Sequence, residues 1–256
     1  MSSAGYTRRG ISSVLGAMLV LAVVSTLVVS IIVYYLPNLK KYAEFKHEDE
    51  LIDQFLRIAD LYPNCEVSLK LGGGATAFNP LKTSATVEVN VSGNFTVEIW
   101  NGSKLIFRCY AVVPCLNLST YNTRIENIRI SYSEGGILMQ QGRYVIVRKP
   151  PDFDRVLRIV RAGNSIEMTV YNYTSGFQEI AGNGFGFVSV RAVKLKSLSF
   201  RNITEVTVTV NDELFQNYWE TYLKSYGFIQ NSPGVWILNL AGNATVTVYN
   251  VTIRLY

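Results

Sequence analysis

The chain has 256 residues, of which only 17% are charged, with a net charge of +5, three cysteines and one histidine. No CxxC pair and no cluster of Cys and His ligands occurs, so the sequence gives no support to a zinc site. The cations are scattered, and no recognition helix, basic arm or aromatic RNA-binding motif is present, so we expect no nucleic-acid partner. Frequent Tyr, Ser, Thr and Asn with few charges favour an extracellular β-rich protein over a cytosolic enzyme.

The N-terminal region is predicted to cross a membrane. Arg8-Arg9-Gly10 precedes an uncharged run from Ile11 to Leu39. Residues 11–36 would span about 39 Å as a helix, enough to cross a hydrocarbon core of about 30 Å. The cations place residues 1–10 on the cytoplasmic side. The run is too long for a signal peptide cleaved after it. An uncleaved anchor and cleavage before the run both remain open.

The residues that precede the run carry a family resemblance. Arg9-Gly10-Ile11-Ser12, followed by the aliphatic stretch to Leu27, resembles the processing site and helix of archaeal type IV prepilins. In that family a membrane peptidase cuts after the glycine, so the resemblance implies cleavage between Gly10 and Ile11. The sequence departs from many bacterial pilins at the fifth position after this bond, where Leu15 replaces a glutamate.

The resemblance implies a structural role without catalysis or a cofactor. The chain would be a subunit of an archaeal type IV pilus or a related surface filament. Its partners would be the membrane, a prepilin peptidase, and copies of itself or other pilin-like subunits. The alternative is a single-span, membrane-anchored extracellular binding or envelope protein that does not polymerise. In a filament core, Gly16 and Ala22 would mark close approach between helices.

Residues 37–63 are predicted to form an amphipathic helix. Pro37 should kink the chain, because it lacks a backbone N–H and its ring crowds the preceding turn. Apolar residues recur at spacings of three and four, with acidic residues on the opposite side. The histidine, His47, is expected to be exposed on this helix, which leaves no plausible catalytic triad. The apolar stripe comprises Ile52, Phe55, Leu56, Ala59 and Tyr62, and the acidic side comprises Glu48, Asp49, Glu50, Asp53 and Asp60.

The remainder, residues 64–256, is predicted to be a β-rich head, with a subdivision near residue 150 left open. Short alternating segments recur with polar turns between them, which is typical of an antiparallel sandwich or barrel. Asn101-Gly102 between two such segments predicts a tight hairpin. A single helix is expected between Asp212 and Tyr226. The fold class is therefore α+β, with a long N-terminal helix and a β-sandwich-like head. A head of this size favours a minor or specialised subunit.

The three cysteines leave several pairings open. Cys109 and Cys115 flank Pro114, and a turn there would bring them together as a disulfide. Cys65 with either of the others, and three free thiols, are the alternatives.

Asn-x-Ser/Thr sequons are more frequent than the composition predicts. Eight occur, where random pairing of Asn with Ser and Thr would give roughly three. We expect extracellular N-glycosylation at several of them. The acceptor asparagines are Asn90, Asn94, Asn101, Asn117, Asn172, Asn202, Asn243 and Asn250.

Overall fold

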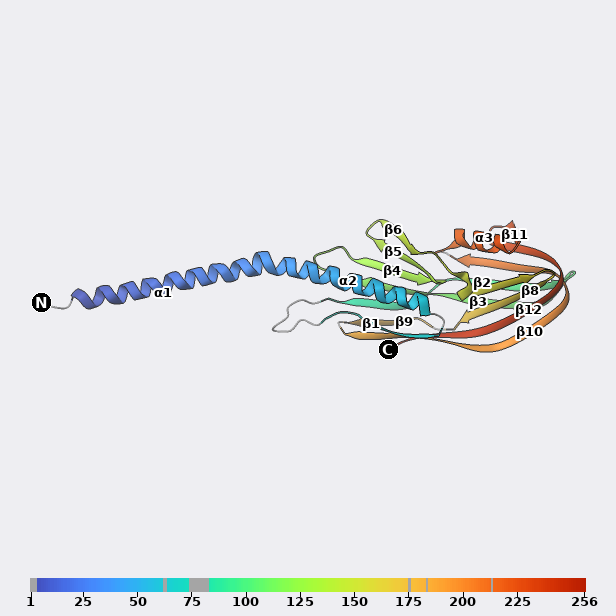
Figure 1. The fold of residues 1–256 in the computed structure, drawn as a ribbon, viewed down its shortest axis with the longest axis horizontal. Helices are drawn as coiled ribbons and strands as arrows, with labels where there is room; N and C mark the ends of the chain where they lie inside the picture. The colour runs from blue at the N-terminus through green and yellow to red at the C-terminus, as the bar shows by residue number, and fades with distance from the viewer. Residues whose placement is uncertain (1–3, 62–63, 74–82, 175, 183, 213) are drawn as a thin grey trace.

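A computed structural model describes residues 4–61, 64–73, 83–174, 176–182, 184–212 and 214–256, with the side chains of residues 4–12 and 59–61 excepted. A single long helix leads into a β-rich head (Figure 1). The helix comprises α1 (Ala4–Ser30), a π-helical segment η1 (Ile31–Tyr35) and α2 (Leu36–Leu61). The α1 part projects from the head, and the α2 part lies along it. This is the α+β layout that the sequence predicts.

The helix changes type immediately before Pro37. The backbone N–H of Leu36 donates to the carbonyl of Ile31, five residues back, instead of four. A proline ring excludes the carbonyl four residues earlier, and a π turn gives the chain the extra room. The side-chain amide of Asn38 donates to the carbonyl of Tyr34 at 3.0 Å. The predicted disruption at Pro37 is therefore a local widening, after which the helix continues to Leu61.

The head is built from one hydrogen-bonded sheet of 12 strands. The central order is β6-β5-β4-β3-β2-β10-β12-β8-β7, with β1 attached to β10, β9 to β2 and β11 to β12. Among the described strand pairs, β12 with β8 is parallel and the others are antiparallel. The strands are β1 (Cys65–Lys70), β2 (Ala85–Asn101), β3 (Lys104–Thr120), β4 (Ile128–Ser133), β5 (Gly136–Gln141), β6 (Tyr144–Lys149), β7 (Leu157–Ala162), β8 (Ser165–Tyr173), β9 (Gln178–Gly182), β10 (Phe185–Asp212), β11 (Ile229–Ser232) and β12 (Val235–Leu255). A short helical turn η2 (Phe153–Arg155) and the helix α3 (Gln216–Ser225) complete the head.

Two long strands fold this sheet over itself. β10 and β12 run along the head together and turn at its far end (Figure 1). The first half of β10 pairs with β1, and its second half pairs with β2. The pairing of β10 with β12 shifts register near Phe200 and Ile203, and Asn202 between them has φ of 57°. β10 and β12 thus keep the mainly antiparallel sheet continuous along the length of the head.

The hydrophobic core is continuous across the head. It includes Phe55 from α2, Val97 from β2, Leu223 from α3 and Val246 from β12. Phe95, Phe153 and Trp219 form an aromatic group beneath α3, with Trp219 ring centroids 5.7 Å and 4.2 Å from the other two. Buried residues on both sides of residue 150 belong to this one cluster. The late helix predicted from the sequence is confirmed as α3, and the Asn101-Gly102 hairpin as the β2–β3 turn.

Candidate functional site: the exposed helix and its junction with the head

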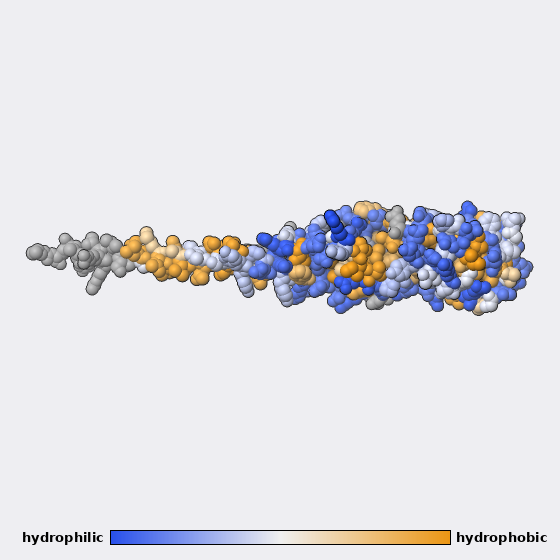
Figure 2. All heavy atoms as spheres, turned by 90° about the horizontal axis from the view of Figure 1, so that it is seen from above, coloured by the Kyte–Doolittle hydropathy of each residue, from blue (hydrophilic) through white to orange (hydrophobic). Residues whose placement is uncertain are grey.

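The apolar half of the long helix is uncovered. All residues from 13 to 35 are exposed in the structure. The large apolar side chains among them are 49% (Val28) to 73% (Tyr34) exposed. Figure 2 shows this apolar rod extending from a mostly polar head. By length and composition the helix can cross a membrane. A surface of this kind requires cover from lipid or from other protein.

Two hydroxyl groups within the exposed rod are bonded to the helix itself. The hydroxyl of Thr26 donates to the carbonyl of Ala22, and that of Ser30 donates to the carbonyl of Thr26, both at 2.8 Å. Such back-bonding removes most of the cost of placing a hydroxyl in an apolar medium. The rod therefore fits either lipid or a helix bundle.

The predicted packing positions have no neighbours within this chain. A Cβ built on Gly16 would meet no atom within 4 Å, and Ala22 is exposed. Small residues are thus not required there by any intramolecular packing. Gly10 and Ile11 lie in the helical backbone of α1, but their side chains are outside the described part of the chain. Cleavage between them stays a prediction.

The helix is fastened to the head by a buried carboxylate on α2. Glu44 is only 1% exposed. One of its oxygens accepts from the backbone N–H and the hydroxyl of Thr123, both at 2.9 Å. The other accepts from the backbone N–H groups of Arg124 at 2.8 Å and Ile125 at 3.1 Å. Three consecutive N–H groups of the β3–β4 loop therefore converge on one side chain, an arrangement that favours a bound carboxylate.

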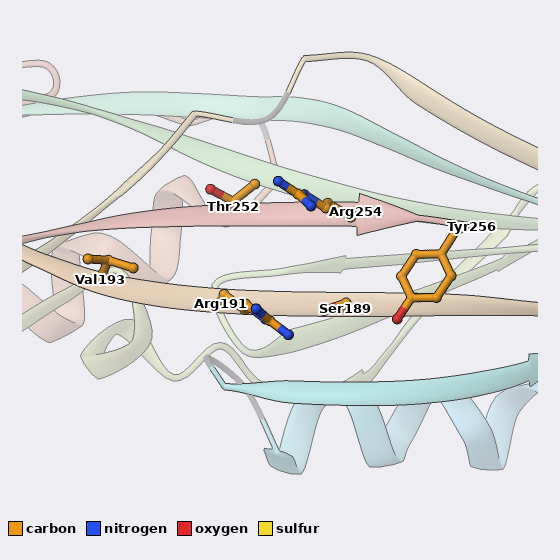
Figure 3. Close-up of a pocket in the computed structure, with 6 residues that line it drawn as sticks. All are labelled: Ser189, Arg191, Val193, Thr252, Arg254 and Tyr256. Atoms are coloured by element: carbon orange, nitrogen blue, oxygen red, sulfur yellow. The ribbon is translucent and has the colours of Figure 1, made fainter.

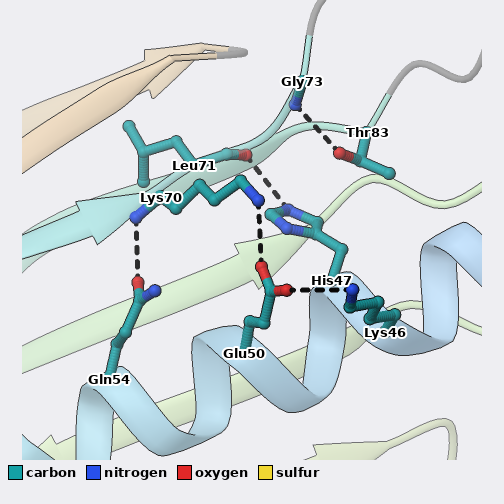
Figure 4. A network of polar contacts seen from close by, with 8 residues as sticks. All are labelled: Lys46, His47, Glu50, Gln54, Lys70, Leu71, Gly73 and Thr83. Atoms are coloured by element: carbon teal, nitrogen blue, oxygen red, sulfur yellow. Dashed lines mark hydrogen bonds and ion pairs between the residues drawn. The ribbon is translucent and has the colours of Figure 1, made fainter. Parts of the chain in front are cut away.

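Two further polar side chains of α2 are buried at the same junction. Glu48 accepts hydrogen bonds from the hydroxyl of Thr120, at 3.2 Å, and from the side-chain amide of Asn122. His47 lies 3.2 Å from the carbonyl of Leu71, just after β1 (Figure 4). Because that carbonyl can only accept, the facing ring nitrogen must carry the proton. These contacts tie α2 to both sides of the head.

A second set of contacts holds β1 against α2. The side-chain oxygen of Gln54 accepts from the backbone N–H of Lys70 at 2.8 Å. The ammonium of Lys70 bonds Glu50 at 3.1 Å (Figure 4). Below these polar contacts, Leu51, Phe55 and Ile58 are fully buried. The junction is thus polar near the exposed rod and apolar further along α2.

The junction shifts the pKa values of Glu44, Glu48 and His47, and the cause differs between them. Burial alone would raise the pKa of Glu44, but the hydrogen bonds from Thr123, Arg124 and Ile125 outweigh it and lower the pKa. Burial raises the pKa of Glu48 above its usual range. Burial has the opposite effect on His47 and lowers its pKa, because burial penalises the charged form, which for histidine is the protonated imidazolium. Ionised Glu44 and neutral His47 therefore hold the docked helix.

The structure corrects two predictions about α2. His47 is buried, so its expected exposure is wrong, and Glu48 faces the head although the sequence analysis placed it on the opposite side. The real buried stripe is centred one residue earlier than predicted and begins with polar side chains. It runs through Glu44, Glu48, Leu51, Phe55 and Ile58. The spacing of three and four residues is visible in the sequence. The prediction differs because it assigned only apolar residues to the buried side, whereas the stripe includes two glutamates.

The predicted disulfide is wrong. Cys109 and Cys115 both lie in β3, which continues through Pro114 without a turn. Six residues of extended strand separate their Cα atoms by about 20 Å, well beyond disulfide reach. Pro114 faces Val91, beside a register shift in the β2–β3 pairing that tolerates its missing N–H. All three cysteines, including Cys65, are free thiols.

The sequon asparagines differ in accessibility. Asn117 is buried, and its side-chain oxygen accepts from the hydroxyl of Ser131 at 2.7 Å. Asn172 is partly buried and accepts from the backbone N–H of Val112 at 3.1 Å. Asn94 and Asn250 are also partly buried. The exposed ones are Asn90, Asn101, Asn202 and Asn243.

Comparison with known proteins places the chain in a family. Among the described residues, no group of three or more His, Cys, Asp or Glu side chains could hold a metal ion. Searches among curated proteins and among solved structures find no match. One family model, described as a family of unknown function (DUF7289), matches residues 9–256. Because that match spans nearly the whole chain, from the exposed helix to the end of the last strand, the protein belongs to the DUF7289 family.

Proposed function

We propose that the protein is a pilin-like structural subunit, held in the membrane by its N-terminal helix before it assembles into an archaeal type IV pilus or a related surface filament. The observation that carries this proposal is the uncovered, uncharged helix surface from residue 13 to residue 35. The preceding residues Arg9-Gly10-Ile11-Ser12 resemble a prepilin processing site and favour a pilin-like subunit over other membrane-anchored proteins.

The exposed rod explains how one chain could exist in two environments. Burying apolar surface is worth about 25 cal/mol per Å², so the rod is stable in lipid and unstable in water. Packing against copies of the same rod keeps that surface covered when the subunit leaves the membrane. The bonded hydroxyls of Thr26 and Ser30 remove a polar obstacle to either environment.

The α2 junction supports an assembly role because it couples the helix to the head. Glu44, Glu48 and His47 join α2 to the β3–β4 loop and to the residue after β1. A helix fixed in this way sets where the head lies once the rod is packed. A plain anchor would function equally well with a loose tether.

We further propose that the head is extracellular and carries N-linked glycans. Exposure favours Asn90, Asn101, Asn202 and Asn243 as acceptors. Buried Asn117 should remain unmodified in the folded protein. Glycopeptide mapping of native protein tests this, and sugar on Asn117 with none on the four exposed asparagines would contradict it.

Replacement of small residues on the exposed rod tests assembly. Gly16→Leu and Ala22→Leu should insert into the membrane normally, because leucine suits lipid. Neither position touches the head, so head stability should be unchanged. In a packed helix bundle, however, each added side chain should cost about 1–3 kcal/mol per subunit. We expect both variants to be at least several-fold depleted from sheared surface filaments.

Val20→Leu is the matched control, since it places the same side chain where a bulky one already stands. It should be recovered in filaments at close to the wild-type level. Equal recovery of Gly16→Leu, Ala22→Leu and wild type, or absence of wild type from that fraction, would instead favour a single-span anchor that does not polymerise.

A further inference from the structure

An open groove lies on the outer face of the head, across β10 and β12. Its volume is about 410 Å³, and it is lined by Ser189, Arg191, Val193, Thr252, Arg254 and Tyr256 (Figure 3). A second hollow of about 390 Å³ shares Ser189, Arg191 and Val193 with it and extends to β1. The two hollows together offer an elongated site on a sheet surface.

Strand register brings two arginines into this groove. Arg191 of β10 pairs with Thr252 of β12, and Arg254 of β12 pairs with Ser189 of β10. The two arginine residues are therefore diagonal neighbours on adjacent strands (Figure 3). Both side chains are exposed, and neither forms an ion pair with a described residue.

One carboxylate, on β1, lies beside this pair. Glu66 of β1 is the closest acidic residue in the register, because it pairs with Ser189. It is therefore a diagonal neighbour of Arg191, whereas Arg254 lies two strands away, at about 10 Å. Two guanidinium groups beside one carboxylate leave the groove with a net positive charge. The hydroxyl of Tyr256 donates to Glu66, and this contact raises the pKa of Tyr256. Like charges close together on one sheet face repel each other, and an anion between them removes that repulsion.

The groove also presents an aromatic platform and hydroxyl groups. The ring of Tyr256 stacks on that of Phe187, with centroids 5.6 Å apart and planes 14° apart. Tyr256 remains 55% exposed. Ser189 and Thr252 lie beside the arginines and can exchange hydrogen bonds with ligand hydroxyls. Flat rings, hydroxyls and paired guanidinium groups together match a ring-shaped ligand that carries negative charge.

We propose that this groove binds an acidic polysaccharide, with carboxylate or sulfate groups held by Arg191 and Arg254 and a sugar ring packed on Tyr256. Guanidinium groups bind such oxyanions through two parallel hydrogen bonds. A nucleic acid is disfavoured, because two cations neutralise too few phosphates for useful affinity at physiological salt. The site is remote from the exposed helix, so it does not depend on filament assembly.

Binding of defined polymers to the full-length protein in detergent tests the proposal. Polygalacturonate supplies carboxylates, dextran sulfate supplies sulfates, and dextran is the neutral comparison. We expect at least one acidic polymer to bind while dextran does not, and the tighter one identifies the preferred anion. Arg191→Gln and Arg254→Gln should each weaken binding about tenfold or more, the size expected for a lost charged hydrogen-bond pair.

Arg201→Gln is the control, because Arg201 is exposed at the bend of β10 and lies outside the groove. It should bind like wild type, and thermal melts should show all three variants folded. Equal binding by every variant, equal binding of dextran, or tighter binding of duplex DNA than of either acidic polymer would overturn the proposal. If one groove variant fails to fold, the other decides.

Discussion

At the scale of single residues, His47 shows how burial changes the chemistry of a side chain. Its ring is 5% exposed and faces the carbonyl of Leu71. Burial lowers its pKa below the ordinary value near 6.5. The charge of Glu50 acts to raise this pKa, and the charge of Lys70 acts to lower it. The folded protein therefore binds this proton less readily than the unfolded chain does.

The pH dependence of head stability follows from that difference. The stability contributed by neutral His47 is complete above about pH 6.5 and falls as the pH drops towards the folded pKa. His47→Gln can still donate to Leu71 but cannot titrate. We expect its Tm to fall less than that of wild type between pH 7.5 and pH 5.5.

Glu48 has a raised pKa and contributes the opposite trend, but it is present in both proteins and cancels in the comparison. Thermal melts followed by circular dichroism provide the measurement. Identical pH dependence in wild type and His47→Gln would show that the histidine does not control docking.

At the scale of elements, α2 and the β3–β4 loop depend on each other. The loop has no regular hydrogen-bonding pattern of its own between Thr120 and Ile128. Glu44 supplies acceptors for three of its backbone N–H groups. Glu44→Gln replaces one of those acceptors with a donor that faces N–H groups, so buried donors are left unpaired.

We expect Glu44→Gln to lower the free energy of unfolding by about 2–3 kcal/mol, as is usual for losing hydrogen bonds to a buried charged group. Asp53→Asn on the exposed side of α2 is the matched control and should change it by less than about 0.5 kcal/mol. Denaturant titration monitored by tryptophan fluorescence measures both. A cost for Glu44→Gln no greater than that of the control would mean that the loop is held by other contacts.

Local signals in the sequence predicted local structure well. Asn101-Gly102 identifies the β2–β3 hairpin because the turn, Gly102-Ser103 between the paired Asn101 and Lys104, depends on a glycine with positive φ, and Gly102 has φ of 59°. The order of an apolar helix and an amphipathic helix before the head was predicted for the same reason, although the helix begins at Ala4 and not at Ile11. The turn predicted at Pro114 is wrong, because the effect of this proline depends on the pairing of β3 with Val91, which is not a local property.

Long-range contacts account for the rest of the differences. Thr123 lies 79 residues from Glu44, so nothing near Glu44 in the sequence indicates that its carboxylate has partners. β10 runs unbroken from Phe185 to Asp212 because β12 pairs with it on both sides of its polar interruptions, which the sequence around them does not indicate. The groove was not predicted, because Arg191 and Arg254 become neighbours only through the pairing of β10 with β12.

At the scale of the whole molecule, an apolar rod and a polar head are joined through one docked helix (Figures 1 and 2). The rod has no intramolecular reason for its small residues Gly16 and Ala22, whereas the head buries a continuous core of its own. The two halves are thus suited to separate tasks. We infer that the rod serves assembly and that the head faces the surroundings of the cell.

The identity of the first residue of the native protein tests this account most directly. Processing as a prepilin removes residues 1–10 and leaves the complete apolar rod at the new N-terminus. Mass spectrometry of N-terminal peptides from native protein should therefore find a chain that begins at Ile11. A native chain that begins at Met1 or Ser2, or after Leu36, would contradict the account.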